Sequence, residues 1–183
     1  MAVTPTVAEK IVLGSGQIFV QEFTDEIPTD ILLEVDENKL GDVLGGAVLT
    51  YKPKLYTAKS DDGTVAKTIV TEEEATLKSG VMTWCGNTLA KLAATARVTE
   101  TAGKRTILIG GIGMQDGKKY VVRFLHSDPV FGTIRVTIVG TNQAGFALAF
   151  AKDKETVVDA EFTALPSDAD GTLIIYEEQI PTV

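Results

Sequence analysis

The stretch ETVVDAEFTALPSDADGTLIIYEEQ, residues 155–179, decides the fold class. Its first half alternates in character: the apolar positions are Val158, Ala160, Phe162 and Ala164, and the polar ones are Glu155, Asp159, Glu161 and Thr163. A period of two is typical of a half-buried β-strand. A cluster of Pro, Asp and Gly at 165–171 ends the pattern, and a second β-rich run follows at 172–176. The segment therefore predicts two strands that pair as a hairpin.

Short alternating segments also fill most of the remaining chain. Between 133 and 139, Ile134, Val136 and Ile138 face one way and polar residues face the other. A long β-rich run at 47–59 is followed by the turn residues Asp61-Asp62-Gly63 and by a return run at 64–78. The centre of this pair, 56–68, is too polar to be covered on both faces. We predict that it protrudes as an extended hairpin.

A helical pattern occurs in one segment, 84–98. Its apolar residues recur at helical spacing and form one stripe: Cys85, Leu89, Leu92, Ala93 and Ala96. One helix among many short strands predicts a mainly β protein, a β-sandwich or barrel with one flanking α-helix and a long extended hairpin loop. We expect residues 1–10 to form a flexible N-terminal arm and residues 11–183 to form a single β domain.

Composition limits the class of protein. The chain has 183 residues, 44% of them hydrophobic, which suits one domain with a sizeable core. Lys plus Arg is 17 and Asp plus Glu is 25, so the net charge is 17 − 25 = −8, which argues against tight binding to nucleic-acid phosphates. No apolar run approaches the roughly 20 residues of a membrane helix, so we expect no membrane insertion, and no signal peptide is recognised. The single cysteine excludes a disulfide within the chain.

Residues that could carry catalysis are scarce. His126 is the only histidine, and it is either a general base near Asp128 or a polar residue at the end of a strand; we expect the second. Cys85 is either a nucleophile near the start of a helix or a small buried apolar residue, and we again expect the second. The sequence therefore predicts a protein that is not an enzyme.

Cofactor and metal motifs are incomplete. The loop Gly110-Gly111-Ile112-Gly113 does not complete the Gly-x-Gly-x-x-Gly pattern of a dinucleotide loop, because Asp116 stands at the position of the third glycine. It also precedes a strand instead of a helix. Glu72-Glu73-Glu74 could bind a metal ion, but on a strand successive side chains point to opposite faces, so only Glu72 and Glu74 are neighbours. The run therefore favours a solvated surface over a metal site. The clusters at 61–63 and 168–171 lack the spacing of a calcium loop and are typical of turns. We expect no cofactor and no metal site.

Four segments together resemble the phage major tail protein family, the subunits of the tail tube. They are KIVLGSGQIFVQEF (10–23), NKLGDVLGGAVLTYKPKLY (38–56), WCGNTLAKLAATA (84–96) and EFTALPSDADGTLIIYEE (161–178). The resemblance implies a structural virion protein without an active site. It implies that six copies form a ring, that rings stack into a tube around a tape measure protein, and that DNA later passes through. It also implies tail terminator and baseplate or tip proteins as partners, with assembly in the cytoplasm of the bacterial host.

The resemblance implies roles for two groups of residues. The protruding hairpin resembles the loop by which such rings stack, and its candidate stacking residues are Tyr56, Lys59, Asp61, Asp62, Gly63 and Lys67. A negatively charged lumen would repel DNA phosphates. From the acidic composition we expect Glu72 and Glu74, or the face that carries Asp159 and Glu161, to contribute to the lining of the lumen.

Two rival classes stay open at this stage. One is another non-catalytic virion component, such as a head decoration protein or an immunoglobulin-like adhesive module. The other is a hydrolase that uses paired carboxylates, although such enzymes line a sugar groove with aromatic residues, which make up only 7% of this chain. The sequence does not distinguish contractile from non-contractile tails or from headless bacteriocin-type particles.

Overall fold

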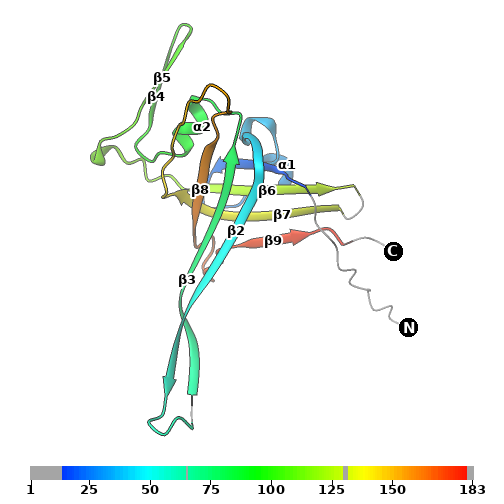
Figure 1. The fold of residues 1–183 in the computed structure, drawn as a ribbon, viewed down its shortest axis with the longest axis vertical. Coiled ribbons are helices and arrows are strands. Elements are labelled where there is room, and N and C mark those ends of the chain that lie inside the picture. The colour runs from blue at the N-terminus through cyan, green and yellow to red at the C-terminus, as the bar shows by residue number, and fades with distance from the viewer. Residues whose placement is uncertain (1–13, 65, 130–131, 181–183) are drawn as a thin grey trace.

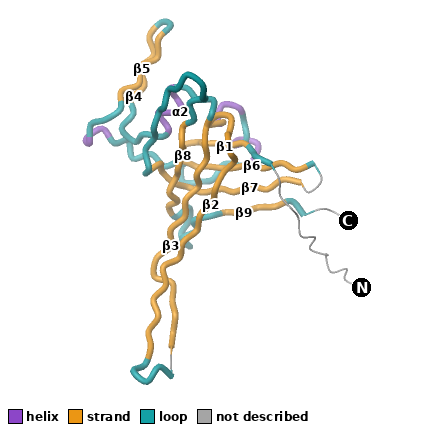
Figure 2. The backbone as a smooth tube through the Cα atoms, viewed as in Figure 1, coloured by secondary structure: helices purple, strands orange, loops and turns teal. Residues whose placement is uncertain are grey.

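The computed structural model describes residues 14–64, 66–129 and 132–180, and most of its elements are strands, as the sequence predicts (Figure 1, Figure 2). The strands are β1 (Gln17–Glu22), β2 (Lys39–Lys59), β3 (Ala66–Val81), β4 (Arg97–Thr101), β5 (Lys104–Leu108), β6 (Tyr120–Asp128), β7 (Gly132–Asn142), β8 (Val158–Leu165) and β9 (Ile175–Glu178). The helices are α1 (Asp30–Leu33), η1 (Asp36–Asn38), α2 (Gly86–Lys91) and η2 (Ile112–Met114). The expected N-terminal arm, 1–10, lies outside the described residues.

Six antiparallel strands close on themselves. The order is β6-β1-β2-β3-β8-β7, and β7 pairs again with β6, so the sheet forms a barrel, with β9 added beside β7. The edge of β7 opposite β6 is divided between two partners. Residues 134–137 pair with β9, whereas residues 139–142 pair with β8. Closure satisfies the backbone groups that an open sheet would leave at its edges.

The predicted C-terminal hairpin is wrong in its pairing, although its alternation is confirmed. Val158, Ala160 and Phe162 are fully buried and Asp159 is exposed. However, β8 and β9 do not pair with each other; both pair with β7. Ser167 closes the intervening loop, because its N–H and its hydroxyl each donate to the carbonyl of Thr172 at 2.9 Å. A period of two fixes which side of a strand is buried but does not name its neighbour.

The main core fills the barrel. Phe162, Leu77, Ile18 and Ile138 are among its buried side chains, and they come from strands distributed around the ring. A smaller cluster lies outside the wall, where Leu33 of α1 packs among Phe19, Val121 and Val139. Its members on β1, β6 and β7 are buried on the outer side because α1 covers them.

The predicted helix 84–98 is much shorter in the structure. It covers only Gly86–Lys91, and the chain is already in β4 from Arg97. Thr88, in the first turn, fixes the start of the helix, since its hydroxyl accepts a hydrogen bond from the Cys85 N–H at 3.2 Å and donates to Leu40 O at 3.1 Å. Leu92 is buried as the stripe predicts. The stripe continued past it only as a pattern of small alanines, which contribute little apolar burial to hold a further turn. The second short helix, α1, was not expected.

The predicted protruding hairpin is confirmed and is longer than expected. β2 and β3 leave the barrel together and run far beyond it as a two-stranded ribbon, toward the bottom of Figure 1. Gly45 and Gly46 interrupt the ladder at the base, where both have positive φ and the register shifts between Leu44 and Ala47. A second, smaller hairpin, β4–β5, projects at the other end of the molecule.

Candidate assembly site

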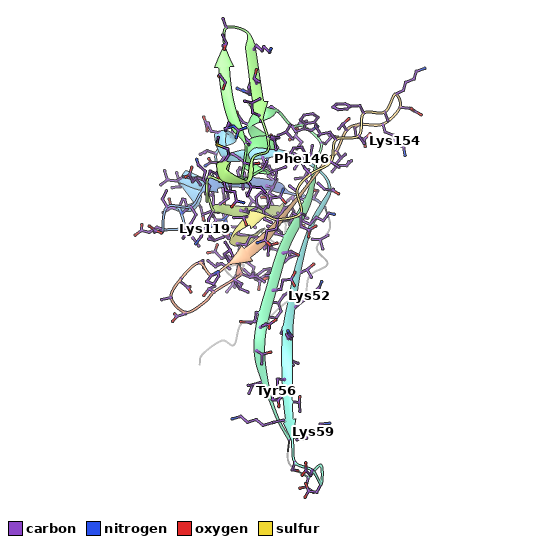
Figure 3. The ribbon with its side chains drawn as sticks, turned by 90° about the vertical axis from the view of Figure 1, so that its left-hand side faces the viewer. Lys52, Tyr56, Lys59, Lys119, Phe146 and Lys154 are labelled. Carbon is purple, nitrogen blue, oxygen red and sulfur yellow. The ribbon has the colours of Figure 1, made fainter. Side chains whose placement is uncertain are left out.

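The arm, defined here as residues 51–74, has no support from the barrel. The pairing of β2 with β1 ends at Asp42, and the pairing of β3 with β8 ends at Thr76. Beyond these points the two strands pair only with each other, within the part of the chain that the structure describes. Figure 3 shows Lys52, Tyr56 and Lys59 spaced along this ribbon, away from Lys119 in the body of the protein. The arm is thus a projecting element with both edges and both faces open.

The arm exposes large apolar side chains. They are Tyr51, Leu55, Tyr56, Ile69 and Val70, each between 47% and 59% exposed. Leu55 lies opposite Val70 and Tyr56 opposite Ile69, so each face of the ribbon carries an apolar pair. An isolated two-stranded ribbon is at best marginally stable in water, and exposed apolar surface of this kind indicates a site of interaction. The ribbon therefore has the character of a surface that a partner covers.

A tight turn closes the tip of the arm. Gly63 takes φ +70°, and its N–H donates to Ser60 O at 2.9 Å. The Ser60 hydroxyl, the Thr64 N–H and the Thr64 hydroxyl all donate to Asp62, and they lower the pKa of its carboxyl to about 2. The candidate stacking residues all lie exposed on the outer part of the arm: Tyr56, Lys59, Asp61, Asp62, Gly63 and Lys67.

The four candidate lumen residues lie on one face of the β2–β3–β8 sheet. Glu72 and Glu74 occupy β3, and Asp159 and Glu161 occupy β8. The register pairs Lys78 with Glu161 and Gly80 with Asp159, so even-numbered residues of β3 share a face with odd-numbered residues of β8. This outward-facing surface is called the charged face below.

Lysines that the sequence reasoning missed lie between these acids. Lys54 Nζ is 3.0 Å from both carboxylate oxygens of Glu72, and Lys52 is directly opposite Glu74. Lys78 Nζ is 3.4 Å from Asp159 Oδ2 and 3.8 Å from Glu161 Oε2. Four acids and three lysines give this set a net charge of 3 − 4 = −1. The matching i, i+2 spacing of Lys52 and Lys54 was the signal that could have revealed them.

Two arginines join α1 to the barrel, and sequence reasoning did not find this cluster either. Arg123 of β6 is buried, and its guanidinium contacts Asp30, Glu34 and the hydroxyl of Thr137. Arg135 of β7 binds both carboxylate oxygens of Glu34, at 2.6 and 3.1 Å. These hydrogen bonds raise the pKa of Arg135, with Glu34 the largest cause. All these contacts are inside one chain and resemble a structural clamp.

The isolated His and Cys residues do not meet. His126 is buried inside the barrel wall, so its expected position as a polar residue at a strand end is wrong: β6 continues to Asp128. Its Nδ1 lies 2.7 Å from Ser15 O, and it lines an opening of about 300 Å³ together with Leu49, Phe124 and Val136. The expectation of a buried Cys85 is also wrong, because this thiol is exposed. The Thr88 N–H lowers its pKa.

The described residues contain no group of three His, Cys, Asp or Glu side chains that could hold a metal ion. None of their helices has the length and apolar character needed to cross a lipid bilayer. The glycine loop at 110–113 leads into the three-residue η2, which is too short to present a phosphate site.

Comparisons with known proteins find similarity among solved structures. No protein-family model matches the chain, and no curated protein matches it. Among solved structures, a chain of the "Virion of native gene transfer agent (GTA) particle" aligns with 87% of this chain and 95% of its own length. The identity is 10% and the TM-score is 0.43, so the two chains are distant in sequence and in backbone geometry.

Proposed function

We propose that this chain is a structural virion protein that assembles into stacked rings and forms the tube of a phage tail. The observation that carries the proposal is the arm: a ribbon that leaves a closed barrel and exposes Leu55, Tyr56 and Ile69. A monomer gains nothing from such a ribbon, because it buries little surface of its own. A copy in the next ring would cover it.

Ring formation follows from the same logic. A contact between two different surfaces of identical subunits repeats from copy to copy, and it closes into a ring when the rotation permits. In the proposed hexamer the charged faces of six copies line the lumen. The barrel carries the core and stabilises each subunit before assembly, so the arm is free to extend toward the adjoining ring.

The charged face suits passage of DNA. A surface that alternates acids and lysines has no extended positive stripe, so it offers no continuous site for phosphates. Under this proposal DNA moves through without adhering. The tape measure protein occupies the lumen during assembly, and tail terminator and baseplate or tip proteins close the ends of the tube. The protein acts in the virion after assembly in the host cytoplasm, and it has no catalytic role.

The first test is negative-stain electron microscopy of the purified chain at rising concentration. The proposal expects rings or hollow tubes with a regular axial repeat. Leu55→Ser with Tyr56→Ser removes two apolar side chains from the arm and is expected to abolish tubes while leaving the fold unchanged. Ile180→Ser, which also removes an exposed apolar group but lies outside the arm, is the matched control.

Two results would count against the proposal. Tubes of ordinary length from the arm variant would show that the arm does not stack rings. Compact monomers from the unaltered chain, both alone and with tape measure protein added, would favour a decoration or adhesive protein instead.

A further inference from the structure

The short helix α1 holds two apolar side chains in solvent. Ile31 is 86% exposed and Leu32 is 63% exposed, whereas the next residue, Leu33, is fully buried. The helix is fixed on the barrel by Arg123 and Arg135 through Asp30 and Glu34. Asn38 Nδ2 also donates to Leu32 O at 3.0 Å. The exposed pair is therefore preorganised, and a partner that covers it would lose little conformational entropy on binding.

Acidic residues surround this pair in the sequence. Residues 11–38 contain seven Asp and Glu and no Lys or Arg. Three of the seven have cationic partners: Glu22 with Lys118, and Asp30 and Glu34 with the two arginines. The other four form no ion pair with the described residues. We call Ile31, Leu32 and these four acids the acidic knob; the acids are Asp25, Glu26, Asp36 and Glu37.

A surface of opposite charge lies on and beside the β4–β5 hairpin. The loop that follows β5 exposes Ile112 to 90%, and Ile109 and Met114 to about half. This loop is also held in place. Arg97 Nη1 donates to Gly110 O at 3.2 Å, and the Gly110 N–H donates to Thr95 Oγ1 at 3.0 Å. We call the loop and the hairpin together the basic ridge: Ile109, Ile112 and Met114 beside Arg97 at the base of the hairpin, and Lys104 and Arg105 toward its tip.

The ridge carries a net positive charge. Its hairpin, 97–108, has three cations, and Glu100, which pairs with Arg105 at 2.5 Å, is its one acid, so the sum is 3 − 1 = +2. In Figure 1 the hairpin points away from the barrel and from α1, so the two surfaces of one copy do not face each other.

We propose that the acidic knob of one copy docks on the basic ridge of the next. The inference rests on the self-assembly proposed above and identifies the surfaces that join neighbours within a ring. The two surfaces combine fixed apolar groups with opposite charges, which steer association and exclude knob-to-knob contact. Because the surfaces differ, the contact is head-to-tail, and each copy uses both.

A mixing experiment tests this directly. All proteins are full-length chains that carry Leu55→Ser and Tyr56→Ser, which remove the proposed arm contact. The knob variant adds Ile31→Ser and Leu32→Ser, and the ridge variant adds Ile109→Ser, Ile112→Ser and Met114→Ser. Every changed side chain is exposed, so folding should persist, and circular dichroism checks this. Sedimentation velocity at low ionic strength measures the size of the assemblies, and Ile180→Ser is the control.

The parent and the control are expected to form rings. Each variant alone should associate roughly a hundredfold more weakly, since loss of central apolar contacts at an interface has effects of that size. An equal mixture should stop at two copies, because the intact knob of one variant fits the intact ridge of the other and the remaining surfaces are inactive.

Three results would overturn the inference: rings from either variant, species larger than two copies in the mixture, or monomers of the parent at every concentration. The arm test is separate, because it asks whether the chain with an unaltered arm forms tubes. Tubes there, together with rings from a knob or ridge variant, would refute the knob-and-ridge contact and leave the proposed function intact.

Discussion

Arg123 Nη1 lies 3.1 Å from Glu34 Oε1, although 89 residues separate them in the sequence. The arginine side chain is 4% exposed and the carboxylate side chain 13% exposed, so both charges are largely removed from water. Arg135 binds the same carboxylate from the neighbouring strand. The position of α1 therefore depends on a shielded charge cluster as well as on the burial of Leu33.

Replacing Arg123 by Met should destabilise the protein by about 3 kcal/mol, because it leaves Glu34 with less compensation for its lost hydration. Urea unfolding measures the change. Lys118→Met removes a cation from the exposed pair with Glu22 and should cost less than about 1 kcal/mol. The double variant Arg123→Met with Glu34→Gln should cost less than the sum of the single changes. Equal losses for Arg123→Met and Lys118→Met would contradict this account.

Gly140 allows β7 to pair on both sides at once. It lies opposite Tyr120 of β6 and Ala164 of β8, and a Cβ there would come within 2.1 Å of Thr163 O. Gly140→Ala should therefore force the two strands apart and destabilise the barrel by about 1–3 kcal/mol. Thermal unfolding compares it with Gly113→Ala, where an added Cβ meets nothing within 4 Å. A Gly140→Ala protein as stable as this control would exclude close packing at that point.

Acid should loosen the tip of the arm. Hydrogen bonds from Ser60 and Thr64 hold the pKa of Asp62 at about 2, below its ordinary value of 3.8. The ionised Asp62 carboxylate therefore stabilises the folded turn fully above pH 3.8, and this contribution is lost as the pH falls through about 2. Amide NMR signals of Gly63 and Thr64 should shift over this range. Asp62→Asn should remove the transition and Asp61→Asn should retain it. The opposite result would show that Asp61, and not Asp62, is the group that titrates.

The charged face gives a prediction about DNA delivery. Changing Glu72, Glu74, Asp159 and Glu161 to Lys moves the charge of the set from −1 to −1 + 8 = +7. If this face lines the lumen, tubes should assemble but DNA should pass slowly or stop, since cations bind phosphates. The reverse change, Lys52, Lys54 and Lys78 to Glu, gives −1 − 6 = −7 and should leave delivery normal. DNA ejection from particles built with each variant measures this, and normal delivery by the Lys variant would reject the assignment.

The sequence predicted local features well. The buried side of β8, the turn at Asp62-Gly63 and the projecting arm each depend on neighbouring residues, so their patterns are visible in the chain. The mainly β class follows from the number of such segments. The lysines beside the candidate acids could also have been inferred, because the arm is a hairpin whose register its turn defines.

Features that depend on distant contacts were missed. β8 and β9 pair with β7 because the closed barrel places that strand beside them. The alternation of apolar and polar residues does not identify the neighbouring strand. α2 ends early because residues 97–101, which the predicted helix partly included, form β4 and pair with β5. The Arg123 cluster joins residues from α1, β6 and β7, and no spacing in the sequence relates them. His126 was expected at a strand end, but the longer β6 places it inside the wall.

Closure of the barrel has a consequence for how the chain is made. β1 pairs with β6, so Gln17 meets Leu125 only after a further 125 − 17 = 108 residues have been synthesised, and Thr76 of β3 meets Thr163 of β8 only after a further 163 − 76 = 87. Contacts between such distant residues form slowly, which leaves the nascent chain without its core for most of translation. The arm, whose strands are close in sequence, can pair much earlier. A ribbon that exposes Leu55, Tyr56 and Ile69 is thus complete before the barrel that carries it.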